Sequence, residues 1–381
     1  MLKPLLFLLA ILCTPCAFAG RSVNHPDHRV GRHFEVRVNT NVELLGFLYF
    51  LGYEGAQSES ASYPEKDRRR YAYGIALYHQ YKLYAGSKNL ATAIGFAQDI
   101  WLDYFINLLI QLEDFPDAKL TDRVDPAYYI RFSPKGEVEE AKKNASRFIE
   151  AMNGLYKEVD FGAYLAKNRA LYVNAIGQVK AGLPDDGFLP AMETFYEGHF
   201  DSYSLVPSLT IPSGMGFGAR YKSGTETHAF HVFGTFAVQQ WADSARIDMG
   251  FADKKHLLEL STHEFGHSFA NPCVDSLPDE LIRGTETLFD PIGEAMAPQG
   301  YPTWKICLYE HFVRAGEVVI ARRLGHREDA ERIRSHYVTS RKFIYLDTLL
   351  VELDQYSTTR NGSYQQAMTN AMLRLRELVK P

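Results

Sequence analysis

The stretch Ser261-Thr262-His263-Glu264-Phe265-Gly266-His267-Ser268-Phe269-Ala270-Asn271-Pro272 holds the one HExxH pattern in the sequence. Residues 253–260, which precede it, are rich in helix formers, and Asp253 is suited to cap a helix that Asn271-Pro272 would end. Residues four apart in a helix lie one turn apart on the same face. His263 and His267 are therefore predicted to point the same way and to hold one metal ion.

Zinc is the metal that this pattern favours, because paired imidazoles suit it in a site that stays open to water. Glu264 directly follows the first His, so its carboxylate would stand beside the metal and accept a proton from bound water. The pattern thus predicts His263 and His267 as zinc ligands and Glu264 as the general base.

A catalytic zinc normally takes a third protein ligand. The metzincin continuation HExxHxxGxxH is disfavoured, because Ala270 replaces its Gly, Cys273 replaces its last His and Pro272 intervenes. The inverted HxxEH order is absent from the sequence. A downstream Glu is the remaining common choice.

Three glutamates compete for this position: Glu286, Glu294 and Glu310. Glu286 has the spacing of the aminopeptidase branch but lacks the Asn-Glu pair of that branch. Glu294 lies in a segment flanked by Gly and Pro. Glu310 lies in the amphipathic stretch 304–315, where a long helix would hold its carboxylate rigidly and Arg314 would follow one turn later.

The sequence also resembles a known family. His263 to Phe269 with Asn271-Pro272, then Tyr301, Trp304 and the run Glu310 to Ala315, resemble a bacterial family of secreted gluzincin-like proteins that are classed as zinc metallopeptidases. The likeness covers most of the chain in layout and two helices in specific residues. It implies His263, His267 and Glu310 as zinc ligands and Glu264 as the base. In related gluzincins a downstream His or Tyr stabilises the oxyanion, which makes His336, Tyr337 and Tyr345 candidates for that role.

Composition places the chain among folded proteins that do not bind nucleic acid. Of its 381 residues 46% are hydrophobic and 13% aromatic, which is ample for a buried core. The formal net charge of -5 gives no electrostatic basis for contact with phosphates.

The N-terminus has the pattern of an export signal, with Lys3, an apolar run from Leu5 to Leu12, and Ala17-Phe18-Ala19 as a cleavage site. The apolar run is shorter than the roughly 20 residues that a membrane span needs. We therefore expect residues 1–19 to be a signal peptide, the protein to be periplasmic or extracellular, and no segment to span a membrane.

The order of predicted elements is that of an α+β protein, mostly helical and zincin-like, with a small sheet before the HExxH helix. We expect a helical N-terminal region, 20–200, and a catalytic region with a helical C-terminal half, 201–381. Thr40 and Glu43 read as a capping box that opens a helix over residues 40–51. Further helices are predicted over residues 68–84, 90–112, 137–159, 164–180, 304–324, 329–336, 342–353 and 363–378.

The sheet is predicted from residues 202–212 and 227–236, paired as a hairpin through the glycine-rich connection 213–225. Such a hairpin would offer an edge strand that aligns an extended peptide substrate. His228 and His231 lie in its second arm and are expected to be polar strand residues rather than ligands.

Cys273 and Cys307 remain after the signal peptide is removed, and an exported protein favours pairing them. If the helices that carry His267 and Glu310 converge on one zinc, their neighbouring segments run close together. We therefore expect a Cys273–Cys307 disulfide; the alternatives are two buried free thiols, or Cys273 as a zinc ligand at the position of the last metzincin His.

The expected function is that of an exported zinc metallopeptidase acting on peptide or protein substrates. Two other functions fit the same residues, namely a binding or scaffold protein with a zinc-organised core and a zinc hydrolase of a non-peptide amide. A structural zinc is normally closed by four protein ligands and needs no base beside it, so Glu264 argues against the scaffold.

Overall fold

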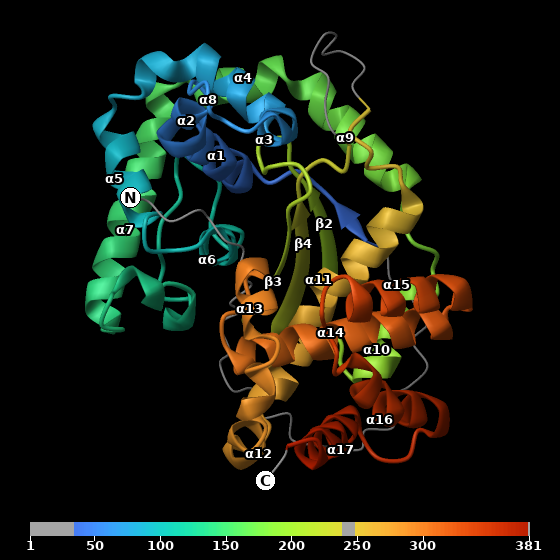
Figure 1. Ribbon diagram of the computed structural model, residues 1–381. Helices are drawn as coiled ribbons and strands as arrows, with labels where there is room; N and C mark the ends of the chain where they lie inside the picture. Colours follow the sequence, from blue (N-terminus) through green and yellow to red (C-terminus); the bar gives the residue numbers. More distant parts are fainter. Residues whose placement is uncertain (1–33, 238–247, 380–381) are drawn as a thin grey trace. The chain divides into compact units, whose positions relative to one another are not determined.

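The computed structural model describes residues 34–237 and 248–379 of the chain (Figure 1). The predicted signal peptide, residues 1–19, lies outside the described residues. The described part is α+β, mostly helical with one small mixed sheet of four strands, as the sequence predicted. Within it, every helix is too short or too polar to cross a lipid bilayer.

The described chain forms two compact units. Residues 34–183 and 202–258 form the first, here called the sheet unit, and residues 184–201 and 259–379 belong to the second, the helical unit. Helix α11 (Lys254–Asp275) begins in the last residues of the sheet unit and continues into the helical unit. The predicted division into residues 20–200 and 201–381 stays a prediction.

The strands of the sheet unit are β1 (Glu35–Val36), β2 (Ser202–Pro207), β3 (Gly216–Ser223) and β4 (Glu226–Phe233). Their order in the sheet is β1-β2-β4-β3 (Figure 1). Strands β1 and β4 run parallel to β2, whereas β3 runs antiparallel to β4. The last five residues of both β2 and β4 are buried without alternation, which is typical of parallel strands covered on both faces.

The predicted hairpin between residues 202–212 and 227–236 is wrong. Strands β2 and β4 are neighbours, but they are parallel, and the hairpin partner of β4 is β3, which lies in the stretch predicted as a connection. The glycines at 216 and 218 weaken the strand pattern there, because glycine has no side chain to pack.

A two-residue turn joins β3 to β4. Ser223 pairs with Glu226 across the turn Gly224-Thr225. Gly224 has a φ of 61°, in the left-handed region that glycine adopts at no steric cost. This tight connection leaves no room for the long loop that the sequence suggested.

Helices make up the rest of the sheet unit. They are α1 (Thr40–Tyr49), η1 (Phe50–Glu54, a π-helix), α2 (Gly55–Gln57), α3 (Glu65–Arg70), α4 (Ala72–Tyr81), η2 (Lys82–Tyr84), α5 (Lys88–Phe96), α6 (Leu102–Leu109), η3 (Pro126–Tyr128), η4 (Ile130–Phe132), α7 (Val138–Glu158), α8 (Phe161–Lys167) and α9 (Arg169–Ala181). The helices predicted over residues 68–84 and 90–112 are therefore each interrupted, the first at Tyr71 and the second between Phe96 and Leu102.

The predicted capping box at the start of α1 is also wrong. Asn39 caps this helix, and its Oδ1 accepts a hydrogen bond from the backbone N–H of Val42 at 3.0 Å. Glu43 points into the core instead of back to the helix start.

Glu43 is a fully buried carboxyl group held by neutral donors. The hydroxyl of Tyr172 donates to its Oε2 at 2.8 Å, and the backbone N–H of Leu209 donates to its Oε1 at 3.1 Å. The hydroxyls of Tyr172 and Tyr164 lie 3.1 Å apart. Burial raises the pKa of Glu43 to about 7, although these hydrogen bonds favour its charged form.

The helical unit contains α10 (Phe188–Tyr196), most of α11, α12 (Asp279–Arg283), η6 (Glu286–Phe289), α13 (Gly293–Met296), η7 (Ala297–Gln299), α14 (Trp304–Arg323), α15 (Arg327–Thr339), α16 (Leu346–Thr359) and α17 (Tyr364–Glu377) (Figure 1). Helix α14 packs against α10, α15 and α16, and its residues 307–320 are all buried. Four of these buried residues are polar: Glu310, His311, Arg314 and Glu317. Buried charged groups are usually paired or bound to a metal, so the partners of these four residues define the candidate site of this unit.

Two glycines let α11 and α14 approach each other around Tyr196. A Cβ on Gly316 of α14 would lie 2.1 Å from the Tyr196 hydroxyl. A Cβ on Gly266 of α11 would lie 3.2 Å both from that hydroxyl and from Cγ1 of Val313. Larger residues at these positions would push the helices apart, and with them the two sides of the site described below.

Helix α11 continues to Asp275, past the Pro272 that was predicted to end it. Proline removes one backbone hydrogen bond, to the residue four before it, and this loss falls near the end of the helix. The helix is recovered at once, since the backbone N–H of Ser276 donates to the carbonyl oxygen of Pro272 at 3.0 Å.

The predicted Cys273–Cys307 disulfide is wrong, because neither cysteine forms a disulfide. Cys273 lies six residues after His267, which is about 600° of helix rotation, so the two side chains leave α11 in different directions. Cys307 is buried, and its Sγ lies 3.4 Å from Nδ1 of His311. The two cysteines are offset by similar distances along their helices from His267 and Glu310, but this says nothing of the direction in which each side chain leaves its helix.

Candidate metal centre

Helix α11 presents the imidazoles of His263 and His267 to the same side, one turn apart, as predicted. Their Nε2 atoms lie 3.2 Å apart, and the ring planes are inclined by 86°. His267 is fully buried, and the side chain of His263 is 13% exposed. The pair therefore faces the protein interior, and of the two rings only that of His263 is partly exposed.

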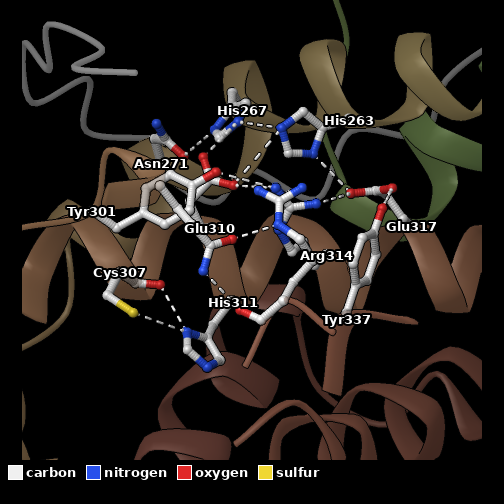
Figure 2. A network of polar contacts seen from close by, with 12 residues as sticks. His263, His267, Asn271, Tyr301, Cys307, Glu310, His311, Arg314, Glu317 and Tyr337 are labelled. Atoms are coloured by element: carbon white, nitrogen blue, oxygen red, sulfur yellow. Dashed lines mark hydrogen bonds and ion pairs between the residues drawn. The ribbon is translucent and has the colours of Figure 1, made fainter. Parts of the chain in front are cut away.

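Glu310 meets the two imidazoles from the middle of α14. Its Oε1 lies 3.3 Å from Nε2 of His267, and its Oε2 lies 3.8 Å from Nε2 of His263. The three possible ligand atoms all lie within 4.8 Å of one another. Figure 2 shows the three side chains converging from the two helices.

The spacing of these atoms fits donors around one small ion. With zinc–ligand bonds of about 2.0 to 2.1 Å, neighbouring donors of a tetrahedral site lie about 3.3 Å apart. The 3.2 Å between the two Nε2 atoms and the 3.3 Å between His267 and Glu310 agree with this value. Two imidazoles and a carboxylate are also the donor types that zinc takes in catalytic sites.

The Nδ1 atoms of both imidazoles already form hydrogen bonds. Nδ1 of His263 donates to Oε1 of Glu317 at 2.8 Å, and Nδ1 of His267 donates to Oδ1 of Asn271 at 3.2 Å. A neutral imidazole with its proton on Nδ1 carries a lone pair on Nε2. Two lone pairs that face each other at 3.2 Å repel, so the arrangement favours a cation between them.

The charges around the centre keep Glu310 ionised. Burial by itself would raise the pKa of this carboxyl, but His267 and Arg314 lower it, and the result is a pKa well below the ordinary range. For His263, burial lowers the pKa and the adjacent Glu317 raises it, with a net increase. A proton on His263 can thus take the place of a metal, so metal binding competes with protonation.

Three further side chains lie beside these candidate ligands: Arg314, Tyr301 and Tyr337 (Figure 2). Nη2 of Arg314 donates to Oε2 of Glu310 at 3.0 Å and to the hydroxyl of Tyr301 at 3.2 Å. The hydroxyl of Tyr337 donates to Oε2 of Glu317 at 2.5 Å. The candidate ligand Glu310 and the His263 partner Glu317 are therefore each held by a buried side chain.

Glu264 is buried on α11, next to His263 in the chain. Consecutive side chains on a helix leave it about 100° apart, so Glu264 flanks the histidine face rather than lying on it. Its role as the general base stays a prediction.

The two other candidates for the third ligand lie apart from this group. Glu286 is exposed on η6, and Glu294 is exposed on α13. His228 and His231 are on β4 of the sheet unit, where Nδ1 of His228 lies 2.7 Å from Oγ of Ser202. Among the residues that the structure describes, the group of possible ligands comprises His263, His267 and Glu310.

The three residues predicted to stabilise the oxyanion, His336, Tyr337 and Tyr345, are each either exposed or already hydrogen-bonded to another group. His336 is exposed on α15, and the hydroxyl of Tyr345 donates to the carbonyl oxygen of Leu288 at 2.7 Å. Tyr337 is near the centre, but its hydroxyl donates to Glu317. The tyrosine that shares Arg314 with Glu310 is Tyr301, which the sequence indicates only through its family likeness.

Sequence reasoning missed the supporting residues although their spacing was visible. Asn271 lies four residues after His267 and shares its helix face. Glu317 lies seven residues after Glu310 and shares the face of that residue. Three charged residues at helical spacing, Glu310, Arg314 and Glu317, within an otherwise largely apolar helix are the signal that would have identified Glu317.

A family model described as "Domain of unknown function (DUF4932)" matches residues 105–367. The matched region covers more than half of the chain and includes every residue of the centre described above. Comparison with curated proteins and with solved structures gave no match.

Proposed function

We propose that this chain, which belongs to the DUF4932 family, is an exported zinc-dependent metallopeptidase with a zincin-like catalytic region. In this proposal His263, His267 and Glu310 hold the zinc, and Glu264 is the general base. The observation that carries it is the pair of Nε2 atoms at 3.2 Å, each with its Nδ1 engaged and both beside the ionised carboxylate of Glu310.

The ligand set supports a catalytic rather than a structural site. Three protein donors leave a four-coordinate ion one position for water or substrate, whereas structural zinc sites usually have four. Glu264 beside the first ligand would be superfluous in a scaffold. The order of a small sheet, the HExxH helix α11 and a third ligand on a later helix is also the order expected of a gluzincin.

Zinc in this position would acidify a water molecule and polarise the scissile carbonyl group. Glu264 accepts the proton of that water and passes it to the leaving amine. Glu317 and Asn271 hold the imidazoles in the tautomer that exposes Nε2. In this proposal Glu264 transfers the proton, whereas Glu317 and Asn271 orient the imidazole ligands.

We further propose Tyr301 as the hydroxyl that donates to the developing oxyanion. Its oxygen accepts from Nη2 of Arg314 at 3.2 Å, which leaves its own proton available for donation. Burial raises the pKa of Tyr301 to about 12, so the phenol keeps its proton at neutral pH. Tyr337 and Tyr345, in contrast, already donate to other acceptors.

The test is digestion of casein and of a peptide library by the purified protein, by the chelator-treated protein and by the same sample after zinc is restored. The proposal predicts cleavage that chelation abolishes and zinc restores, and no cleavage by Glu264→Gln at equal zinc content. If zinc stays bound but neither substrate is cleaved, the protein is a zinc-organised scaffold or acts on a non-peptide amide. A panel of non-peptide amide substrates then separates these two.

A further inference from the structure

Arg314 is a buried cation in the wall of the centre. It lies on α14 four residues after Glu310 and three before Glu317, and it is 5% exposed. Ion pairs at this helical spacing are usually solvated and weak. A buried guanidinium is expensive to desolvate, so its neighbours must compensate for the loss of water.

The neighbours of Arg314 fix the plane of its guanidinium. Its carbon lies 4.5 Å from the ring centroid of Tyr337 and 4.7 Å from that of Phe343. Its Nη2 lies 3.2 Å from the Tyr301 hydroxyl. With aromatic rings against it and a phenol at its edge, the group has little freedom to rotate.

This fixed cation distinguishes the two oxygens of Glu310. Nη2 of Arg314 lies 3.0 Å from Oε2, and this oxygen lies 3.8 Å from Nε2 of His263, whereas Oε1 lies closer to the imidazole pair, 3.3 Å from Nε2 of His267. We propose that Arg314 is a positioning residue that makes Glu310 bind the metal through Oε1 alone. The proposal rests on the metal centre proposed above.

The same guanidinium lies near both carboxylates of the site, those of Glu310 and Glu317. Its Nη1 lies 3.9 Å from Oε1 of Glu317, the oxygen that accepts from Nδ1 of His263. Figure 2 shows Arg314 between the two carboxylates. Arg314 therefore places the ligand Glu310 and the partner of the ligand His263 together, from one helix.

Ligation through one oxygen matters for the proposed reaction. A carboxylate that binds through both oxygens fills an additional coordination position, and a catalytic site needs its free positions for water and substrate. Removing Arg314 releases Oε2, which can then turn toward the metal. A change in coordination number is therefore the expected signature of its loss.

Substitution of cobalt(II) makes this coordination visible. The protein is freed of metal with chelator and titrated with cobalt(II), and the visible d–d bands are recorded for the wild type, Arg314→Met and Arg314→Lys. Four-coordinate cobalt(II) absorbs more strongly than cobalt(II) with five or six ligands. We expect the wild type to give intense bands and Arg314→Met to give bands of clearly lower molar absorptivity.

Arg314→Lys covers the case in which Arg314→Met does not fold. Lysine keeps the charge but lacks the planar fork that holds Oε2, so its spectrum should move in the same direction as that of Arg314→Met. Arg322→Met is the matched control, because Arg322 lies on the same helix and pairs with Asp354. Its spectrum should be that of the wild type.

The possible outcomes separate this inference from the metal centre itself. If the wild type binds neither cobalt nor zinc, the proposed centre fails and the inference fails with it. If the wild type binds cobalt and every Arg314 variant that folds, Arg314→Met or Arg314→Lys, has the wild-type spectrum, only the role of Arg314 is overturned. A lower absorptivity in either variant, with Arg322→Met unchanged, supports it.

Discussion

Nδ1 of His263 lies 2.8 Å from Oε1 of Glu317, a residue two helical turns beyond Glu310 on α14. One helix thus supplies both the proposed ligand Glu310 and the carboxylate that orients the proposed ligand His263. Partners of this kind fix the ring and its tautomer, and their loss costs about 10- to 100-fold in metal affinity.

Replacing Glu317 by Ala should therefore lower zinc affinity by about 10- to 100-fold. Glu317→Gln should have a smaller effect, because its amide oxygen can still accept from Nδ1 of His263. The measurement is competition for zinc against a chromophoric chelator. Glu328→Ala, an exposed site on α15, is the control. Equal zinc affinity of Glu317→Ala and wild type would remove Glu317 from the site.

Tyr301→Phe should lower kcat by about 100-fold and leave KM nearly unchanged, because an oxyanion donor acts mainly in the transition state. Tyr345→Phe is the matched variant, since its hydroxyl donates to the Leu288 carbonyl oxygen. It should keep the wild-type kcat. Steady-state kinetics on a peptide found by the library digest gives both constants. A wild-type kcat for Tyr301→Phe would exclude this tyrosine as the donor.

Glu43 should make the protein less stable as pH rises. Its pKa is raised from 4.5 to about 7 in the folded state, so folding favours the protonated form. The resulting contribution to the free energy of unfolding is fully present below pH 4.5 and is lost as pH rises through about 7. It amounts to about 3 kcal/mol.

Urea unfolding of the wild type and Glu43→Gln between pH 4 and pH 8 measures that contribution. The free energy of unfolding of the wild type should fall relative to that of Glu43→Gln across this range. Glu65→Gln, at an exposed position, should follow the wild type. Parallel curves for the wild type and Glu43→Gln would show that Glu43 has an ordinary pKa.

The two cysteines should behave as separate thiols. Cys307 is buried and burial raises its thiol pKa, so it should resist alkylation until the protein is unfolded. Cys273 is partly exposed and should react in the native protein. Mass spectrometry after alkylation with and without denaturant gives both results. A Cys273–Cys307 disulfide in a non-reduced digest would contradict the structure.

The parts of the site that depend on local spacing could be predicted from the sequence. His263 and His267 face the same way because they are four residues apart in a helix, and this holds wherever the helix lies. The choice of Glu310 over Glu286 and Glu294 needed more, namely family likeness and then the convergence of α14 with α11. The His263–Glu317 contact spans 54 residues and was not visible in any local pattern.

The errors in the fold have similar causes. Strand β3 was missed because its glycines resemble a loop, while its pairing with β4 is a property of the sheet. Glu43 fitted a capping box by spacing, but the buried hydrogen bonds from Tyr172 and Leu209 draw it inward. In both cases tertiary partners outweighed a short-range signal.

The most direct test of the account is zinc binding by the wild type, Glu310→Ala, Glu286→Ala and Glu264→Gln, measured by competition with a chromophoric chelator and by metal content. We predict one zinc per chain for the wild type, Glu286→Ala and Glu264→Gln. Glu310→Ala should lose more affinity than the about 10- to 100-fold expected for an outer partner. Loss of zinc from Glu286→Ala, with wild-type affinity in Glu310→Ala, would contradict the proposed centre.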